Sequence, residues 1–465
     1  MQDHKTDYLI VGSGAVGMAF ADVILHETDA SMIIVDRFAK PGGHWNVAYP
    51  FVTLHQPSAF YGVSSRALGS GRIETTGLNK GLSELATGAD VSAYFDAVMR
   101  EQFLPSGRVQ YFPMCDYTGD GHFINSISGK THHVSAAKTV DATHLKTSVP
   151  STHTPNFSVD SDVSFMPLND LPKVDSPPDG FVVIGAGKTG IDAVLWLLEH
   201  GVEPDDIQWI MPRDAWLLDR ANTQPSAAFF NSTMGAQAGQ MESIAQAESI
   251  EDMFGRLESC GYFVRIDTNV RPEMFHGATI SQAELGALRR IKHNIIRMGR
   301  VQFISPNEIT LDEGKIPTTP DTLHIDCSAR AISNAEMKPI FQGSLITPQM
   351  VRSYQPVFSA AFIAHIEATR EDEIEKNRLC GVVPLPNHDT DYLRFTAAFM
   401  MNQYNWGQDK ELRAWLKNNR LDGFSKLVSS IAEDDHEKMA IMKRLRENSF
   451  PAMSKLQGFL AEFDG

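Results

Sequence analysis

Two stretches of the chain repeat one pattern of apolar and polar positions. In each, a four-residue apolar run, 8–11 or 181–184, leads into a glycine-rich turn and then into a longer stretch of helix-forming residues. A short apolar run bounded by glycine is typical of a buried strand, and the longer stretch is typical of a helix. Strand, turn and helix in this order open a βαβ unit, so the pattern predicts two units about 173 residues apart, from Gly12 to Gly185.

Further apolar runs extend this prediction along the chain. Runs at 32–35 and 207–211 predict the second strand of each unit, and the segments before them predict helices over 18–26 and 191–200. Helical spacing of apolar residues predicts additional helices over 282–296 and 357–368 and across 410–460.

The first glycine turn carries a complete nucleotide-binding fingerprint. Residues 12–17 place the motif G-x-G-x-x-G between the strand and the helix, which is the context that the motif requires. The first glycine permits the tight turn, the second lets a pyrophosphate approach the backbone, and the third lets the helix pack on the strand. The helix N-terminus then presents unpaired N–H groups to the phosphates. The residues expected to bind the nucleotide here are Gly12, Ser13, Gly14, Ala15 and Gly17.

Asp36 ends the second strand of this unit, 22 residues after Gly14. An acid at about this distance accepts hydrogen bonds from the ribose hydroxyls of a dinucleotide, and its charge repels a 2′-phosphate. On these residues alone, the first ligand is FAD or NAD rather than NADP.

The residues after Asp36 resemble the flavin-containing monooxygenases and the Baeyer–Villiger monooxygenases. In those families the acid is followed by Gly-Gly-x-Trp and then by Tyr-Pro, which here stand at 42–45 and 49–50. The resemblance implies that the first ligand is FAD, that Asp36 holds its adenosine ribose, and that the glycine–tryptophan turn lies along FAD towards the flavin. Glycine allows this close approach, and the indole provides an apolar wall with one N–H donor. The residues expected to bind FAD therefore also include Arg37, Gly43, His44 and Trp45.

The second glycine turn, residues 185–190, repeats the fingerprint. Its Gly-Lys-Thr end is similar to a P-loop, but that motif needs a glycine where Val182 stands, so a nucleoside triphosphatase is not expected. After the next strand comes Arg213 rather than an acid, and an arginine there can give two parallel hydrogen bonds to a 2′-phosphate. Since Lys188 adds positive charge, the second ligand is expected to be NADPH, with NADH as the alternative. The residues expected to bind it are Gly185, Gly187, Lys188, Thr189, Gly190 and Arg213.

Two further segments, 141–144 and 326–329, each follow an apolar strand. They resemble the Ala-Thr-Gly turn by which flavoproteins with two dinucleotide domains leave one domain for the other, although His144 and Ala329 replace its glycine. The resemblance implies an α/β fold with two Rossmann-like dinucleotide-binding domains, in which the FAD domain is discontinuous and the NADPH domain is inserted into it. The expected divisions are an FAD domain over 1–150 and 325–400, a proline-rich linker over 151–178, an NAD(P)H domain over 179–324 with a helical insertion at about 221–260, and a helical C-terminal extension over 401–465.

Composition narrows the remaining classes of function. The 465 residues are 42% hydrophobic and 21% charged, as is usual for a globular protein, and the formal net charge is −16. A chain this acidic is a poor candidate for binding nucleic acid or anionic lipid. Its four cysteines form no C-x-x-C pair, so neither a metal site nor a dithiol site is expected. With no signal peptide or membrane span visible, we expect a cytoplasmic protein with a small-molecule substrate, and its oligomeric state stays open.

The two sites together predict an FAD-dependent oxidoreductase. We expect NADPH to reduce FAD by hydride transfer, followed by oxygen activation and monooxygenation of a small organic substrate. Two alternatives remain: an FAD-dependent NAD(P)H oxidoreductase without oxygenation, and a non-catalytic dinucleotide-binding sensor. The monooxygenases carry Phe-x-Gly-x-x-x-His before the NADPH domain, whereas residues 165–170 here read Phe-Met-Pro-Leu-Asn-Asp. This departure keeps the first alternative open.

Few side chains can be assigned to the chemistry itself. A helix beginning near Pro356 is expected to stabilise the negative charge of a reduced flavin through its N-terminus. Because they flank the turn expected near the flavin, His44, Asn46, His55 and Gln56 are candidates for the substrate side. No catalytic residue is assigned.

Overall fold

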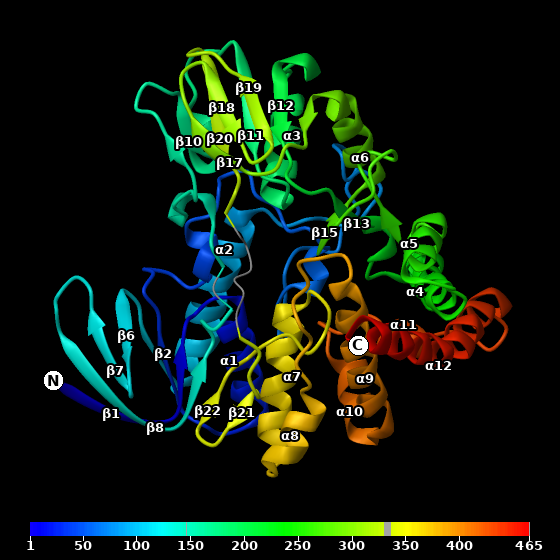
Figure 1. Ribbon diagram of the computed structural model, residues 1–465. Helices are drawn as coiled ribbons and strands as arrows, with labels where there is room; N and C mark the ends of the chain where they lie inside the picture. Colours follow the sequence, from blue (N-terminus) through cyan, green and yellow to red (C-terminus); the bar gives the residue numbers. More distant parts are fainter. Residues whose placement is uncertain (146, 330–335, 465) are drawn as a thin grey trace.

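Two sheets organise the chain, a mixed sheet with parallel central strands in the lower part of Figure 1 and a parallel sheet in its upper part. The computed structural model describes residues 1–145, 147–329 and 336–464. The first sheet has the strand order β21-β22-β8-β1-β2-β5, with the hairpin β6–β7 attached to β8. Its strands are β1 (Gln2–Val11), β2 (Met32–Val35), β5 (Val109–Phe112), β6 (Cys115–Gly119), β7 (His122–Asn125), β8 (Thr131–Asp141), β21 (Phe341–Gln342) and β22 (Leu345–Ile346).

The second sheet has the order β10-β20-β11-β12-β16, and all of its neighbouring pairs are parallel. Its strands are β10 (Phe165–Pro167), β11 (Gly180–Ile184), β12 (Ile207–Ile210), β16 (Ile295–Ile296) and β20 (Thr322–Asp326). Strands from before and after this stretch share the first sheet. The first domain is therefore discontinuous and the second is inserted into it, as the resemblance of the two exit turns implies.

Smaller sheets accompany these two. The sheet β19-β18-β17-β9 packs its apolar residues against one face of the second sheet, where Val182 and Ile210 meet Ile304 and Leu311. The sheet β14-β13-β15 continues the second domain towards the C-terminal helices in Figure 1. The bounds of these strands and of the separate hairpin β3–β4 are β3 (Gly62–Val63), β4 (Arg66–Ala67), β9 (Ser158–Val159), β13 (Ala215–Asp219), β14 (Phe263–Val264), β15 (Met274–Ile280), β17 (Val301–Ile304), β18 (Glu308–Leu311) and β19 (Gly314–Pro317).

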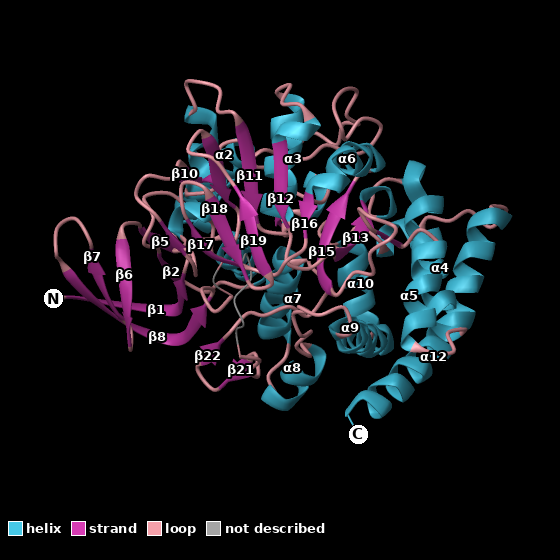
Figure 2. Cartoon of the chain, turned by 45° about the horizontal axis from the view of Figure 1, so that its top comes forward, coloured by secondary structure: helices cyan, strands magenta, loops and turns pink. Residues whose placement is uncertain are grey.

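Helices cover the sheets and form a separate group on one side of the molecule, where Figure 2 shows α4, α5 and α12 together. The main core joins α1 and α7 to the first sheet, and α7 is buried along nearly its whole length. The helices are α1 (Ala15–Glu27), α2 (Gly88–Val98), α3 (Lys188–Glu199), α4 (Phe230–Ala245), α5 (Ile250–Ser259), α6 (Gln282–Leu288), α7 (Pro356–Thr369), α8 (Glu373–Leu379), α9 (Asp391–Gln408), α10 (Lys410–Asn418), α11 (Ser425–Ser429) and α12 (His436–Asp464).

Most of the elements predicted from apolar spacing are present. The second strand of the first unit is β2 with the predicted bounds, and α4 and α5 lie where the helical insertion is expected. The helix expected over 282–296 is wrong in its second half. Here α6 ends at Leu288, a 3₁₀ segment follows, and β16 pairs with β12. Two β-branched residues find backbone partners at the sheet edge, and this pairing prevails over the helical spacing.

The proline-rich stretch expected to be an extended connector holds β9 and β10. Both strands add to sheets of the second domain, through β17 and β20 respectively. The stretch is thus extended in conformation and anchored by backbone pairing. Among the described residues, no helix combines the length and the apolar character that crossing a membrane requires.

The third glycine of the first fingerprint yields a test of the fold. A Cβ on Gly17 would lie 2.0 Å from the carbonyl oxygen of Gly12, and both atoms belong to backbone that strand and helix hold in place. We expect Gly17→Ala to lower the free energy of unfolding by about 2 kcal/mol or more, measured by urea denaturation.

A matched alanine separates this clash from the general effect of removing a glycine. Gly255 lies exposed in α5 with nothing within 4 Å of its Cβ position. Gly255→Ala should leave stability unchanged or raise it by up to about 1 kcal/mol. Equal stability of the two variants would contradict the close packing of α1 on its turn.

Candidate functional site

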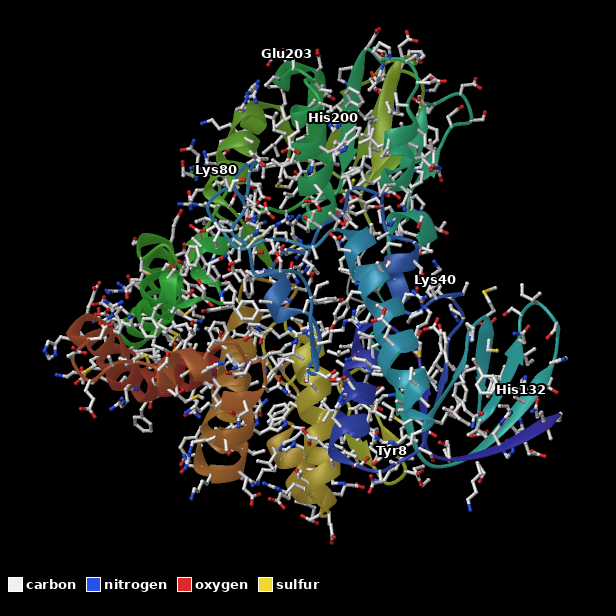
Figure 3. All side chains as sticks on the ribbon, turned by 180° about the vertical axis from the view of Figure 1, so that it is seen from behind. Tyr8, Lys40, Lys80, His132, His200 and Glu203 are labelled. Carbon is white, nitrogen blue, oxygen red and sulfur yellow. The ribbon has the colours of Figure 1, made fainter. Side chains whose placement is uncertain are left out.

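Both glycine turns end at a helix whose N-terminus lacks a side-chain cap. Gly14 is the N-cap of α1 and Gly187 is the N-cap of α3, and neither helix receives a side-chain hydrogen bond there. Figure 3 places His200 and Glu203 at the outer end of α3, so its first turn, with Lys188, lies at the inner end of the helix. The first N–H groups of both helices therefore remain available to an anion, with the positive end of each helix dipole behind them.

One continuous cleft of about 2540 Å³ contains both turns. It brings together residues that lie up to 201 positions apart in the predicted sites, from Gly12 to Arg213. The predicted site residues that line it are Gly12, Gly14, Ala15, Asp36, Arg37, Gly43, His44, Trp45, His55, Gln56, Gly185, Gly187, Lys188, Thr189 and Arg213.

Asp36 is buried at the end of β2 and is fixed by the first glycine turn. One carboxylate oxygen accepts hydrogen bonds from the Ser13 backbone N–H at 2.5 Å and from its hydroxyl at 2.8 Å. The other accepts one from the Phe38 N–H at 2.8 Å. A carboxylate can accept about four hydrogen bonds, so the anchored group retains capacity for a hydroxyl of a ligand. Ser13 thus orients Asp36.

The turn expected to lie along FAD packs directly on the first glycine turn. Gly42 and Gly43 both have positive φ, 119° and 60°, and a Cβ on Gly43 would stand 3.0 Å from the Gly14 Cα. These positions need glycine because any side chain would be strained and would press on the neighbouring turn. The two turns therefore present adjacent stretches of backbone in the cleft.

Two side chains of this turn, His44 and Trp45, line the cleft, whereas Asn46 stabilises the turn itself. Trp45 donates from Nε1 to the Tyr61 hydroxyl at 2.9 Å, which fixes its indole at the cleft wall. Burial lowers the pKa of His44 to about 4, so its imidazole is neutral near pH 7. Asn46 instead donates to the carbonyls of Lys40 and Gly43 and so closes the turn.

The middle glycine of the second turn faces open space, whereas that of the first turn is covered by Gly43. A Cβ on Gly187 would meet nothing within 4 Å, which leaves room for a ligand above the backbone. Lys188 contacts the Asp192 carboxylate one turn along α3, and that carboxylate also accepts from the Tyr49 hydroxyl at 2.6 Å. The positive charge expected at the phosphates is therefore shared with a carboxylate.

Tyr49 also connects the two domains. It reaches from the Tyr-Pro segment of the first domain to α3 of the second, and the adjacent Phe51 stacks on Trp196 with 5.0 Å between ring centroids. Burial, followed by the charge of Asp192, raises the pKa of Tyr49 well above its ordinary value, so the phenol stays protonated. The Tyr-Pro segment thus holds the second helix N-terminus against the cleft.

Arg213 follows β12 and lies in the cleft at the edge of the second sheet. Its guanidinium donates to the Asn387 side-chain oxygen at 3.0 Å and contacts His388 Nδ1 at 3.3 Å. These partners belong to the loop between α8 and α9. The arginine therefore joins the second domain to the C-terminal half of the chain.

His55 and Gln56 line the cleft on a loop held by a residue that sequence reasoning missed. Arg220 is fully buried, donates to the His55 carbonyl at 2.8 Å and pairs with Glu284 at 2.8 Å. Burial, followed by the charges of Lys188 and Arg220, lowers the pKa of His55 well below its ordinary value. No motif surrounds Arg220, so only the assembled fold reveals its role.

The two turns that leave the domains have the same geometry. Asp141 accepts from the N–H and hydroxyl of Thr143, and Asp326 accepts in the same way from Ser328. Both turns line the cleft beside the glycine turns. Within the described residues, no three or more His, Cys, Asp or Glu side chains gather into a group that could hold a metal ion.

The N-terminus of α7 opens onto the same cleft, as expected for the helix near Pro356. Tyr354, Gln355 and Pro356 line the cleft, and Gln355 is the N-cap residue. Sequence reasoning did not single out Tyr354, which has a positive φ of 47°. The long α7 thus directs its positive end at the space between the two glycine turns and the C-terminal helices.

Comparison with solved structures finds weak likenesses. A flavin-containing monooxygenase from Stenotrophomonas maltophilia has 12% identity and a TM-score of 0.46, covering 78% of this chain and 97% of that one. An open form of cyclohexanone monooxygenase has 12% identity and a TM-score of 0.46, over 78% and 88%. A bacillithiol disulfide reductase from Bacillus cereus has 14% identity and a TM-score of 0.45, over 79% and 100%.

Comparison with curated sequences finds much stronger similarity, while no family profile matches the chain. The relatives are the uncharacterized proteins Rv2000 and MT2056 of two Mycobacterium tuberculosis strains and Mb2023 of Mycobacterium bovis. Each is 47% identical over 429 residues, which is 92% of this chain and 79% of the relative. With this identity over nearly its whole length, the chain belongs to the family of these mycobacterial proteins.

Proposed function

We propose that the chain is an oxidoreductase that uses FAD and NADPH and oxygenates a small organic substrate. The observation that carries this proposal is that two uncapped helix N-termini, each preceded by a glycine fingerprint, open onto one cleft. A single dinucleotide site would serve a simple binding protein. Two sites in one cleft allow electrons to pass from one ligand to the other.

The first site fits FAD. Gly14 and Gly43 leave backbone on both sides of the position where a pyrophosphate meets the N-terminus of α1, and Asp36 is held by Ser13 to accept ribose hydroxyls. Trp45, fixed by Tyr61, supplies the apolar wall farther along. The negative charge of Asp36 excludes a 2′-phosphate from this site.

The second site fits NADPH. The open space at Gly187 admits a pyrophosphate to the N-terminus of α3, and Arg213 stands after β12 where a 2′-phosphate would lie. Because Asp192 neutralises much of the Lys188 charge, discrimination between NADPH and NADH rests mainly on Arg213.

When bound, the two cofactors would supply hydride transfer and oxygen activation. The protein's own contribution is to position the two cofactors and to exclude water from the space between them. The N-terminus of α7 lends positive potential to a negative group between the domains, and His44, being neutral near pH 7, adds no charge of its own. Aromatic and aliphatic side chains around Trp45 and Tyr354 keep the intervening space apolar.

A second candidate function is FAD-dependent NAD(P)H oxidation without oxygenation. The segment β10, residues Phe165–Pro167, and the 3₁₀ turn after it lack the glycine and histidine of the monooxygenase linker motif. Product analysis separates the two candidates. Oxygenation places oxygen from O₂ in a substrate, whereas simple oxidation returns hydrogen peroxide or a reduced acceptor for each NADPH consumed.

The role of Asp36 can be tested by FAD titration. Asp36→Asn retains the size of the side chain and removes the charge that strengthens its hydrogen bonds. Since a hydrogen bond to a charged group contributes about 1.5–3 kcal/mol, we expect FAD affinity to fall by roughly 10- to 100-fold. Flavin fluorescence quenching measures the dissociation constant. Asp29→Asn, at an exposed carboxylate just before β2, is the control and should bind FAD as the unchanged protein does.

The role of Arg213 can be tested by cofactor preference. Arg213→Ala should raise the KM for NADPH by roughly 10-fold or more and change the KM for NADH much less, because only NADPH carries the 2′-phosphate. Initial rates of NADPH and NADH oxidation in air give both KM values.

Asn387→Ala serves as the matched control for Arg213. This variant removes the amide that accepts from Arg213 and keeps the Arg213 guanidinium. If a disturbed loop alone weakened nucleotide binding, the affinity for NADPH and NADH would fall alike. Equal losses with NADPH and NADH in Arg213→Ala would contradict the assigned role.

A further inference from the structure

The C-terminal helices form a wall of the cleft beyond the nucleotide turns. Apolar side chains of α9, α11 and α12 line it, among them Phe399, Met400, Val428, Leu445 and Met453. On α12 the lining residues recur every three or four positions, so one face of the helix borders the cleft along several turns. The amphipathic pattern of these helices thus serves a cavity wall in addition to the core.

This wall carries positive charge without compensating acids. Among the residues of α9 to α12 that line the cleft, the charged ones are Arg413, Lys417 and Arg446. Arg413 and Lys417 stand one helical turn apart on α10 and share a face. Two acids of these helices face other partners, since Glu411 lies near Arg370 and Glu447 lies near Lys443. On a chain of net charge −16, this part of the cleft is locally basic.

Farther inside, buried polar atoms lack partners in the described part of the chain. Trp216 Nε1 and Gln355 Oε1 belong to side chains that are 2% and 5% exposed, and the Tyr354 hydroxyl is likewise buried. All three residues line the cleft. Leaving such groups unpaired is costly, so we expect water or a polar group of a bound ligand to pair with each of them.

The outer rim of the same region exposes large apolar side chains. Met401 and Tyr404 of α9 and Phe450 of α12 are 44%, 64% and 79% exposed, and each lines the cleft. Apolar side chains and cations that line one cleft match a ligand that is itself both apolar and charged.

We propose that this part of the cleft binds an amphiphile with an apolar chain and an anionic head, of the class of long-chain carboxylates. The chain lies between α9 and α12 among the apolar side chains, and the head stays at the opening with Arg413, Lys417 and Arg446. A cationic amphiphile would fit the same apolar wall and be repelled by the three cations. The inference deepens the proposed function by naming its substrate class, and it rests on that function for turnover, whereas binding is independent of it.

The first test compares ligands of one chain length on the full chain with FAD and NADP⁺ present. We expect dodecanoate, below its micelle concentration, to bind roughly tenfold more tightly than dodecanol, and dodecyltrimethylammonium to bind more weakly than either. Isothermal titration gives the constants. Octanoate should bind more weakly than dodecanoate, by about two- to fourfold for each methylene removed, since buried methylenes drive the binding. Added salt should weaken dodecanoate and spare dodecanol.

The second test reverses the three cations together, as Arg413→Glu, Lys417→Glu and Arg446→Glu. Dodecanoate affinity should fall at least about tenfold, with dodecanol affinity within about twofold. The matched control reverses Lys410, Lys426 and Lys443, which lie on α10, α11 and α12 outside the cleft lining and produce the same change of net charge. The control should bind both ligands as the unchanged protein does.

Several results would overturn the inference. One such result is equal affinity for dodecanoate and dodecanol. A second is an equal loss of dodecanoate affinity in the two triple variants. A third is that dodecanoate competes with NADPH and still does so in the triple variant of the cleft cations. Anaerobic bleaching of FAD by NADPH is measured on the same preparation. Bleaching without dodecanoate binding defeats the ligand class alone, and dodecanoate binding without bleaching defeats the proposed redox function alone.

Discussion

The constraint on which the site depends is the contact between the first and third glycines of each turn. A Cβ on Gly17 would lie 2.0 Å from the Gly12 carbonyl oxygen, and one on Gly190 would lie 2.1 Å from the Gly185 carbonyl oxygen. Only glycine lets the helix approach its strand so closely, and this approach aims the first N–H groups of α1 and α3 into the cleft. The first glycine of each turn is confined too. Its Cβ would lie 2.9 Å from Thr143 Cγ2 in one domain and 2.3 Å from the Cys327 carbonyl oxygen in the other. The strand that enters each domain and the strand that leaves it are thereby held side by side, as β1 beside β8 and β11 beside β20.

Features that depend on neighbours in sequence could be predicted. The strand before each turn, the glycine fingerprint, the helix after it and the acid of β2 are all local, and the structure contains each of them at or near the expected residues. The discontinuous first domain followed from two similar exit turns. In contrast, Ile295–Ile296 forms a strand that pairs with β12, although the spacing of its apolar residues predicted a helix. Arg220 had no local signature, because its meaning lies in contacts to His55 and Glu284, which are more than 60 residues away in either direction.

The surroundings of Lys188 could be predicted from the sequence only in part. Asp192 stands four positions later on the same helix, and oppositely charged side chains at this spacing pair. The pairing was therefore readable from sequence, and it removes much of the positive charge that the glycine turn alone suggested. The third member, Tyr49, was not readable, since it reaches α3 from the other domain. The Tyr-Pro segment that carries it was identified only by resemblance, and in the structure it connects the two domains through the hydrogen bond from Tyr49 to Asp192.

The distribution of cations bears on how an acidic chain would hold the anionic ligands that we propose. Lys188 is neutralised by Asp192, and buried Arg352 is neutralised by Asp422 at 2.8 Å. Both act as structural groups, because a buried charge needs a partner. In the nucleotide sites that we propose, the pyrophosphates would be held by backbone N–H groups and helix dipoles, whose strength does not depend on net charge, and Arg213 would hold the 2′-phosphate. Arg413, Lys417 and Arg446 differ, since they line the cleft at exposed positions, where water stabilises their charge. There they can select the sign of an incoming ligand without destabilising the fold.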